Sequence, residues 1–74
     1  MRITDLEVGE AYVVRRSFRD AQGTTVLEGD RQTLRRIGAQ AGRFEVVFQE
    51  ETLWLEEDAQ REVVEHAERF FELA

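Results

Sequence analysis

The chain has 74 residues, of which 42% are hydrophobic and 35% charged, and its formal net charge is -6 at pH 7. This length permits a single domain, residues 1–74, and the apolar content is too high for a disordered chain. The sequence contains no cysteine, which excludes disulfides, thiolate metal ligands and cysteine nucleophiles. No apolar run reaches the roughly 18 residues of a membrane helix and no signal peptide precedes residue 10, so we expect a cytoplasmic protein without membrane contact.

The charge is divided unevenly along the chain. Residues 1–44 carry eight Arg against six acidic residues, a net charge of +2, whereas residues 45–74 carry two Arg against ten acidic residues, a net charge of -8. Nucleic-acid affinity comes largely from neutralisation of phosphates by basic side chains, so the negative total makes nucleic acid an unlikely partner.

The first half of the chain shows short strand patterns separated by glycine turns. Residues 11–18 alternate as a strand, residues 24–27 form a short irregular arm after a turn at Gly23, and a second strand spans residues 32–37. Strict alternation would put Leu34 and Ile37 on opposite faces, which favours a bulge or bend between them. We expect residues 38–42 to form the next turn.

Two short strands, joined by a turn over residues 49–52, form the strongest pattern in the sequence. Apolar side chains alternate along residues 44–48 and 53–55, and Val47 and Trp54 add apolar groups to the opposite face. The pattern predicts a hairpin that is buried on both faces. Such a hairpin needs a second layer to cover it.

The C-terminal segment supplies that layer in our prediction. Apolar residues follow one another at helical spacing, in one stripe made of Ala59, Val63, Ala67, Phe70 and Phe71. Asp58 is the expected N-cap, because its carboxylate can accept from the free amides of the first turn. The sequence therefore predicts one amphipathic helix over about residues 58–73, which covers Trp54 and the hairpin.

The first half resembles a family of small bacterial proteins that is catalogued only as a domain of unknown function with an SH3-like barrel. The resemblance rests on the pattern Leu6-x-x-Gly9-x-x-Tyr12-x-Val14-x-x-Ser17-Phe18-x-Asp20-x-x-Gly23, followed by Gly29-Asp30. It implies a mainly β fold, a small antiparallel barrel over about residues 6–56 that is capped or flanked by the C-terminal helix. Proteins with this fold mostly bind other molecules, and the resemblance carries over no catalytic residue.

Four Arg and the single Trp are the candidate partner contacts. Arg15, Arg16, Arg35 and Arg36 could form a basic stripe on neighbouring strands, and Trp54 could be a platform for a peptide. Neighbours in a strand point to opposite faces, so we predict that one Arg of each pair meets the acidic helix and the other is free. The alternative, which we favour for the stripe as a whole, is that these Arg pair with the protein's own acids.

No pattern in the sequence indicates catalysis, a metal or a cofactor. His66 is the only imidazole and has acidic neighbours but no nucleophile nearby. The acidic clusters Glu50–Glu51 and Glu56–Asp58 lack the alternating Asp and the turn glycine of a calcium loop. We therefore predict a protein that is not an enzyme and that uses no cofactor.

These observations lead to three hypotheses of function. The first is a non-catalytic module that binds another protein. The alternative is an acidic structural unit that associates with a second copy of itself through an uncovered strand edge. The third is a protein that binds an acidic or phosphate-bearing ligand through its Arg-rich strands.

Overall fold

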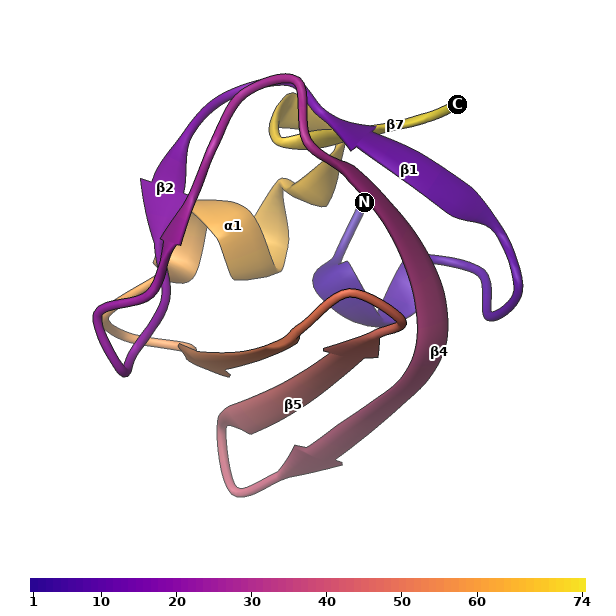
Figure 1. The fold of residues 1–74 in the computed structure, drawn as a ribbon. Coiled ribbons are helices and arrows are strands. Elements are labelled where there is room, and N and C mark those ends of the chain that lie inside the picture. Colours follow the sequence, from indigo (N-terminus) through magenta and orange to yellow (C-terminus); the bar gives the residue numbers. More distant parts are fainter.

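A computed structural model describes all 74 residues as a mainly β protein with two antiparallel sheets and one small α-helix (Figure 1). The larger sheet has the strand order β6-β5-β4-β1-β7, with bounds β1 (Ala11–Val14), β4 (Arg31–Gln40), β5 (Arg43–Phe48), β6 (Thr52–Glu56) and β7 (Phe71–Leu73). The smaller sheet pairs β2 (Phe18–Arg19) with β3 (Thr25–Val26). β6 and β7 are the two edges of the larger sheet, so this sheet is open.

The sheet curls around three short helical segments. These segments are the 3-10 helices η1 (Ile3–Asp5) and η2 (Ala67–Arg69) and the helix α1 (Arg61–Glu65). Figure 1 shows the long, bent β4 on one side and α1 and the N-terminal segment within the curve. Sixteen buried apolar residues fill the space between them in one core, which contains Ile3, Leu6, Tyr12, Val14, Val26, Leu34, Phe44, Val46, Phe48, Leu53, Leu55, Val63, Val64, Ala67, Phe70 and Phe71.

The predicted hairpin over residues 43–56 is present as β5 and β6. Val46 pairs with Leu53, and both side chains are completely buried on the concave face of the sheet. The prediction of burial on both faces is wrong, because Val47 and Trp54 point to the other face and are only half-buried. The helical segments cover the concave face alone. Trp54 therefore does not lie under the helix.

The predicted long helix from Asp58 is also wrong. Helix α1 ends at Glu65, a 3-10 turn follows, and the chain then leaves as strand β7, which pairs with β1 so that Val14 faces Phe71. Without β7 the peptide groups along that edge of β1 would lack partners, and aromatic residues favour strands. Gln60 and not Asp58 occupies the N-cap position. No helix in the structure has the length and apolar character needed to cross a membrane.

Two boundaries in the first half also differ from the prediction. The strand expected over residues 11–18 is interrupted after Val14, where the chain bends before β2. β4 continues to Gln40 through the expected turn, and only Ala41 and Gly42 turn the chain, both with positive φ (53° and 77°). Two such residues are the usual connection of a tight hairpin. The predicted bulge is confirmed, because the register of β4 against β5 shifts between Leu34 and Arg36.

Phe71 anchors the last strand in an aromatic cluster. Its ring stacks on Phe48 with centroids 5.7 Å apart, and the edges of Phe18 and Tyr12 approach it at 5.7 Å and 6.5 Å. Phe70 also packs edge-to-face against Phe18, at 5.4 Å. These contacts join the C-terminal segment to Tyr12, Phe18 and Phe48, which lie in three other parts of the chain. The structure of this segment therefore depends on packing against residues that are distant in sequence.

Candidate functional site

Trp54 lies at the middle of β6 on the convex face of the sheet, where its side chain is partly accessible. Its backbone is fixed by the turn between β2 and β3: its N–H donates to Asp20 Oδ2 at 3.0 Å, and its carbonyl accepts from Ala21 N–H at 2.7 Å. β6 is an edge strand, so these bonds occupy peptide groups that would otherwise face water. The strand that carries the indole is therefore held at its outer edge by hydrogen bonds to the turn between β2 and β3.

Asp20 is the residue that holds this turn in place. Its carboxylate is buried, with 4% of the residue exposed. Oδ1 accepts from the backbone N–H groups of Gln22 and Thr24 at 3.0 and 2.8 Å, while Oδ2 binds Trp54. One side chain thus closes the turn and docks it on the sheet, which brings Gln22 close to the convex face.

A row of three residues crosses the convex face at Trp54. Glu45 pairs with Gly38 on one side and with Trp54 on the other. Paired residues of antiparallel strands point to the same face, and Gly38 contributes no side chain to this row. A hollow of about 810 Å³ lies over it, lined by Gln22, Arg36, Gly38, Ala39, Gln40, Ala41, Arg43, Glu45 and Trp54.

Two ion pairs border the hollow. Arg36 Nη2 lies 2.8 Å from Glu45 Oε1, and Arg43 Nε lies 3.5 Å from Glu56 Oε1. Both guanidinium groups are more than half exposed, so these pairs contribute little to stability and can exchange partners easily. The hollow therefore combines an aromatic surface with exposed charged groups, and the paired side chains of Arg36 and Glu45 lie next to Gly38.

The structure separates the five predicted contact residues. Trp54 and Arg36 come together at the convex hollow. Arg35 is the extra residue at the bulge, is exposed and makes no hydrogen bond or ion pair. Arg15 and Arg16 lie in the bend after β1, away from this face.

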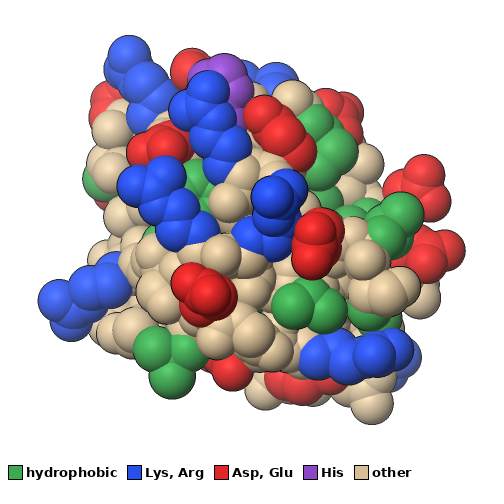
Figure 2. Space-filling view, turned by 90° about the horizontal axis from the view of Figure 1, so that it is seen from above, with side chains coloured by type: hydrophobic (Ala, Val, Ile, Leu, Met, Phe, Trp, Pro, Cys, Tyr) green, Lys and Arg blue, Asp and Glu red, His purple; other side chains and the backbone are tan.

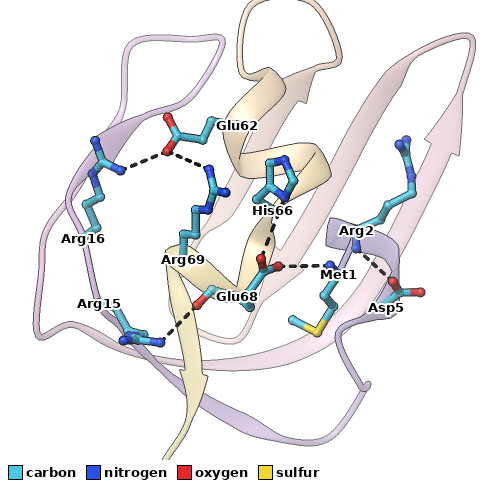
Figure 3. Close-up of polar contacts among 9 residues, drawn as sticks. All are labelled: Met1, Arg2, Asp5, Arg15, Arg16, Glu62, His66, Glu68 and Arg69. Carbon is cyan, nitrogen blue, oxygen red and sulfur yellow. Dashed lines mark hydrogen bonds and ion pairs between the residues drawn. The ribbon is translucent and has the colours of Figure 1, made fainter.

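The prediction that one Arg of each pair meets the acidic helix and the other is free is wrong for both pairs. Arg15 and Arg16 both contact the C-terminal segment: Arg15 donates to the carbonyl of Glu68 at 3.2 Å, and Arg16 Nη1 lies 2.9 Å from Glu62 Oε1 (Figure 3). Both can do so because they lie in a bend and not in a strand. Arg36 instead pairs with a neighbouring strand, at Glu45.

Charged side chains interleave over the face that Figure 2 shows, seen from above. Glu62 is shared between Arg16 and Arg69, whose Nη1 lies 3.7 Å away, while Glu68 contacts the amino group of Met1 at 3.0 Å (Figure 3). That amino group lowers the pKa of the Glu68 carboxyl. Elsewhere on the surface, the Arg2 guanidinium donates a hydrogen bond of 2.6 Å to the Glu57 carboxylate, and this bond raises the pKa of Arg2.

The other residues weighed from the sequence have structural partners. His66 is partly exposed, with Nδ1 3.8 Å from Glu68. In the first acidic cluster, Glu50 accepts from the backbone N–H of Thr33 and Glu51 accepts from the Gln32 amide. In the second, each member pairs with a different Arg: Glu56 with Arg43, Glu57 with Arg2 and Asp58 with Arg61.

Sequence reasoning did not identify the remainder of the hollow, namely Gln22, Gly38, Ala39, Gln40, Ala41, Arg43 and Glu45. The available signal was the glycine at position 38. Its φ lies outside the positive range that favours glycine, so no turn requires it, and a glycine inside a strand often marks a close approach by another group. The assignment of residues 38–42 to a turn hid this signal.

Comparison with known proteins identifies a shared fold. No family model matches the sequence, and no curated protein matches it. Among solved structures, an integron cassette protein from the mobile metagenome of Vibrio cholerae is similar, with a TM-score of 0.88 and 21% sequence identity. The alignment covers 96% of this chain and 88% of that protein. At this identity, the similarity concerns the fold alone.

Proposed function

We propose that this protein is a non-catalytic protein-interaction module, and that its partner binds at the convex hollow around Trp54. The observation that carries this proposal is the partly exposed indole in the same row as Gly38, with Glu45 between them, on a well-supported part of the sheet. Trp is the residue type most enriched among binding hot spots, because it offers a large contact area at a low entropic cost. A partner side chain can lie flat against the strand backbone only where a neighbouring residue has no side chain.

The choice of glycine at position 38 supports the same interpretation. Glycine in a strand interior is less favourable than most residues by about 0.5–1 kcal/mol. A Cβ at this position would meet its nearest atoms at ordinary contact distances, Arg36 Nη1 at 3.5 Å and Glu45 Oε1 at 3.7 Å. The fold therefore has room for a Cβ at this position, so packing within the chain does not require glycine, and the approach of a partner to the strand would explain its cost.

For the fold, we propose an SH3-like small barrel of the bacterial family that the first half of the sequence resembles, working in the cytoplasm. The five antiparallel strands, the strong curl of the sheet and the separate β2–β3 arm support this proposal. The unpaired edges of β6 and β7 make it an open variant of such a barrel.

The test is the substitution Gly38→Val, which fills the hollow without a change of charge. We expect an unchanged or slightly higher melting temperature, because Val favours strands, together with the loss of partners captured from a lysate of the native organism. Thr52→Val is the matched control, since Thr52 is exposed on β6 and does not line the hollow. Trp54 is the only Trp, so its fluorescence should change when a captured partner is added to the wild type.

Three results would contradict the proposal. One is the repeated absence of any partner beyond the controls. Another is a partner that binds the Gly38→Val variant as tightly as the wild type. The third is a large loss of stability in this variant, which would show that Gly38 serves the bend of β4 and not a ligand.

Self-association is the alternative function, and one observation favours it. The outer edge of β7 is unpaired, and Leu73 at its end is 63% exposed. A second copy could extend the sheet at this edge. The strand has only three residues, so few backbone groups are available to pair with a second copy.

A further inference from the structure

We infer that a second hollow, between the bend after β1 and the start of α1, binds a phosphate monoester group. It has a volume of about 270 Å³ and is lined by Arg16, Ser17, Phe18, Arg19, Ala59, Gln60, Arg61, Glu62, Val63 and Phe70. None of these residues lines the convex hollow. The inference is therefore independent of the proposed protein-binding surface.

The net charge of the lining residues indicates the class of ligand that this hollow would bind. Arg16, Arg19 and Arg61 face one carboxylate, that of Glu62, which gives the hollow a net charge of +2. A phosphate monoester carries a charge of about -1.5 to -2 at neutral pH, so it matches this lining more closely than a carboxylate does. The rest of the molecule is strongly acidic, and anions have little reason to collect elsewhere on it.

Arg16 makes two contacts within the chain at the edge of this hollow. Its Nη1 lies 2.9 Å from Glu62, and its guanidinium carbon lies 5.4 Å from the centre of the Phe70 ring. Arg69 approaches the same carboxylate from another side, at 3.7 Å, and so offsets part of its charge. A guanidinium has five N–H donors, so Arg16 keeps donors for an anion beside its contact with Glu62.

The guanidinium groups of Arg19 and Arg61 also use only some of their N–H donors within the chain. Arg19 donates one bond to the carbonyl of Gly23 at 3.3 Å, and Arg61 contacts Asp58 at 3.5 Å. A guanidinium has five N–H donors, so both retain donors for an oxyanion. Three guanidinium groups around one hollow suit the several acceptor oxygens of a phosphate group.

Two neutral donors complete the lining. The Ser17 hydroxyl oxygen accepts from the backbone N–H of Glu28 at 2.8 Å, which leaves its O–H free to donate. The Gln60 side-chain carbonyl accepts from the backbone N–H of Glu56 at 2.8 Å, which leaves its NH₂ group free in the same way. Both residues therefore have free donors that can form hydrogen bonds to an anion.

The experiment is a titration of the ¹⁵N-labelled full chain, followed by two-dimensional NMR at constant ionic strength. The probes are inorganic phosphate, O-phosphoserine and a short phosphoserine peptide, with chloride and unmodified serine as blanks. We expect saturable shifts at the backbone amides of residues 16–19 and 59–62 with the three phosphate probes only. Equal affinity for all three would indicate a free phosphate ester as the ligand, and tighter binding of the peptide would indicate a phosphorylated protein side chain.

The two test variants are Arg16→Gln and Arg61→Gln, and the matched control is Arg35→Gln. Each removes exposed positive charge and leaves the core intact, and Arg35 does not line the hollow. We expect about tenfold weaker binding for each guanidinium removed from the hollow, and no change beyond ionic screening for Arg35→Gln. The inference is wrong if the phosphate probes cause no saturable shifts, if chloride causes the same shifts, or if all variants bind alike.

Discussion

At the scale of single residues, Asp20 contributes more to the fold than its short side chain indicates. Its buried carboxylate accepts three backbone N–H groups from two different segments, the turn after β2 and the middle of β6. Any substitution that removes the oxygens leaves these donors without partners beneath the docked turn. The position of Trp54 depends on the same bonds.

We therefore predict that Asp20→Ala lowers the free energy of unfolding by about 2–3 kcal/mol, since unsatisfied buried donors have a large cost. Asp20→Asn keeps one acceptor oxygen and should lose less. Urea unfolding at neutral pH measures both. Glu28→Ala is the control because Glu28 is exposed and its carboxylate has no partner. An Asp20→Ala variant as stable as this control would contradict the assigned role.

Glu68 supplies a pH-dependent contact at the same scale. The hydrogen bond from the Met1 amino group holds the pKa of Glu68 below the ordinary value of 4.5. A depressed pKa in the folded state means that the contact stabilises the fold above the ordinary pKa and is lost as the pH falls through the lower folded value. Because Glu68 is exposed, the contribution is small.

Glu68→Gln removes this titration. We expect the melting temperature of the wild type to fall more steeply than that of the variant as the pH falls below the ordinary pKa of 4.5. At neutral pH the variant should be slightly less stable than the wild type. Parallel melting curves over the whole pH range would show that the contact does not form in solution.

At the scale of elements, the local sequence predicts the β5–β6 hairpin and the bulge of β4 but not the structure of the C-terminal segment. The hairpin of β5 and β6 follows from alternation over adjacent residues, and the bulge at Arg35 follows from the spacing of Leu34 and Ile37. Both are local patterns with a local cause. The spacing of apolar residues after Asp58 fits a helix equally well, yet only residues 61–65 form one.

The deciding interactions in that segment are distant in sequence. Phe71 pairs with Val14 and stacks on Phe48, and neither contact can be derived from residues 58–74. The convex hollow has the same origin, because Gln22 and Trp54 come together through the hydrogen bonds of Asp20 and Ala21 to Trp54. Trp54 and Arg36 were identifiable as surface candidates from residue type, whereas the space over Gly38 required the register of three strands.

Phe71→Ala tests the importance of β7. Truncation of a buried Phe typically costs about 3–5 kcal/mol, which is most of the stability expected for a chain of this size. We expect this variant to be largely unfolded at 37 °C by circular dichroism. Leu73→Ala is the control on the same strand, since Leu73 is 63% exposed, and it should melt near the wild type. Similar melting temperatures for the two variants would contradict the role of Phe71 as the anchor.

At the scale of the whole molecule, ion pairs join the positively charged first half of the chain to the negatively charged second half. Five ion pairs join an Arg of residues 1–44 to an acid of residues 45–74, namely Arg2–Glu57, Arg15–Glu72, Arg16–Glu62, Arg36–Glu45 and Arg43–Glu56. All have exposed side chains, so each contributes only about 0–1 kcal/mol. Their main consequence is that few acids remain free to bind a cation.

The state of association distinguishes the proposed module from the self-associating alternative. We expect sedimentation equilibrium to give a mass of 8.7 kDa at every concentration, because the free edge at β7 is short. A mass that rises with concentration would favour the alternative. In that case Leu73→Glu, which places a charge at this edge, should restore the monomer.

The pairing of β1 with β7 also determines how this chain reaches its native state. Residues 12–14 find their partners at residues 71–73, so one of the earliest strands cannot be completed until nearly the whole chain is available. Small proteins dominated by such long-range pairing fold on the order of milliseconds to seconds, far more slowly than helical bundles. We expect the β4–β5–β6 meander, whose strands adjoin in sequence, to be ordered in the transition state, and the C-terminal strand to join afterwards. Substitutions in β7 should then accelerate unfolding and leave the folding rate almost unchanged.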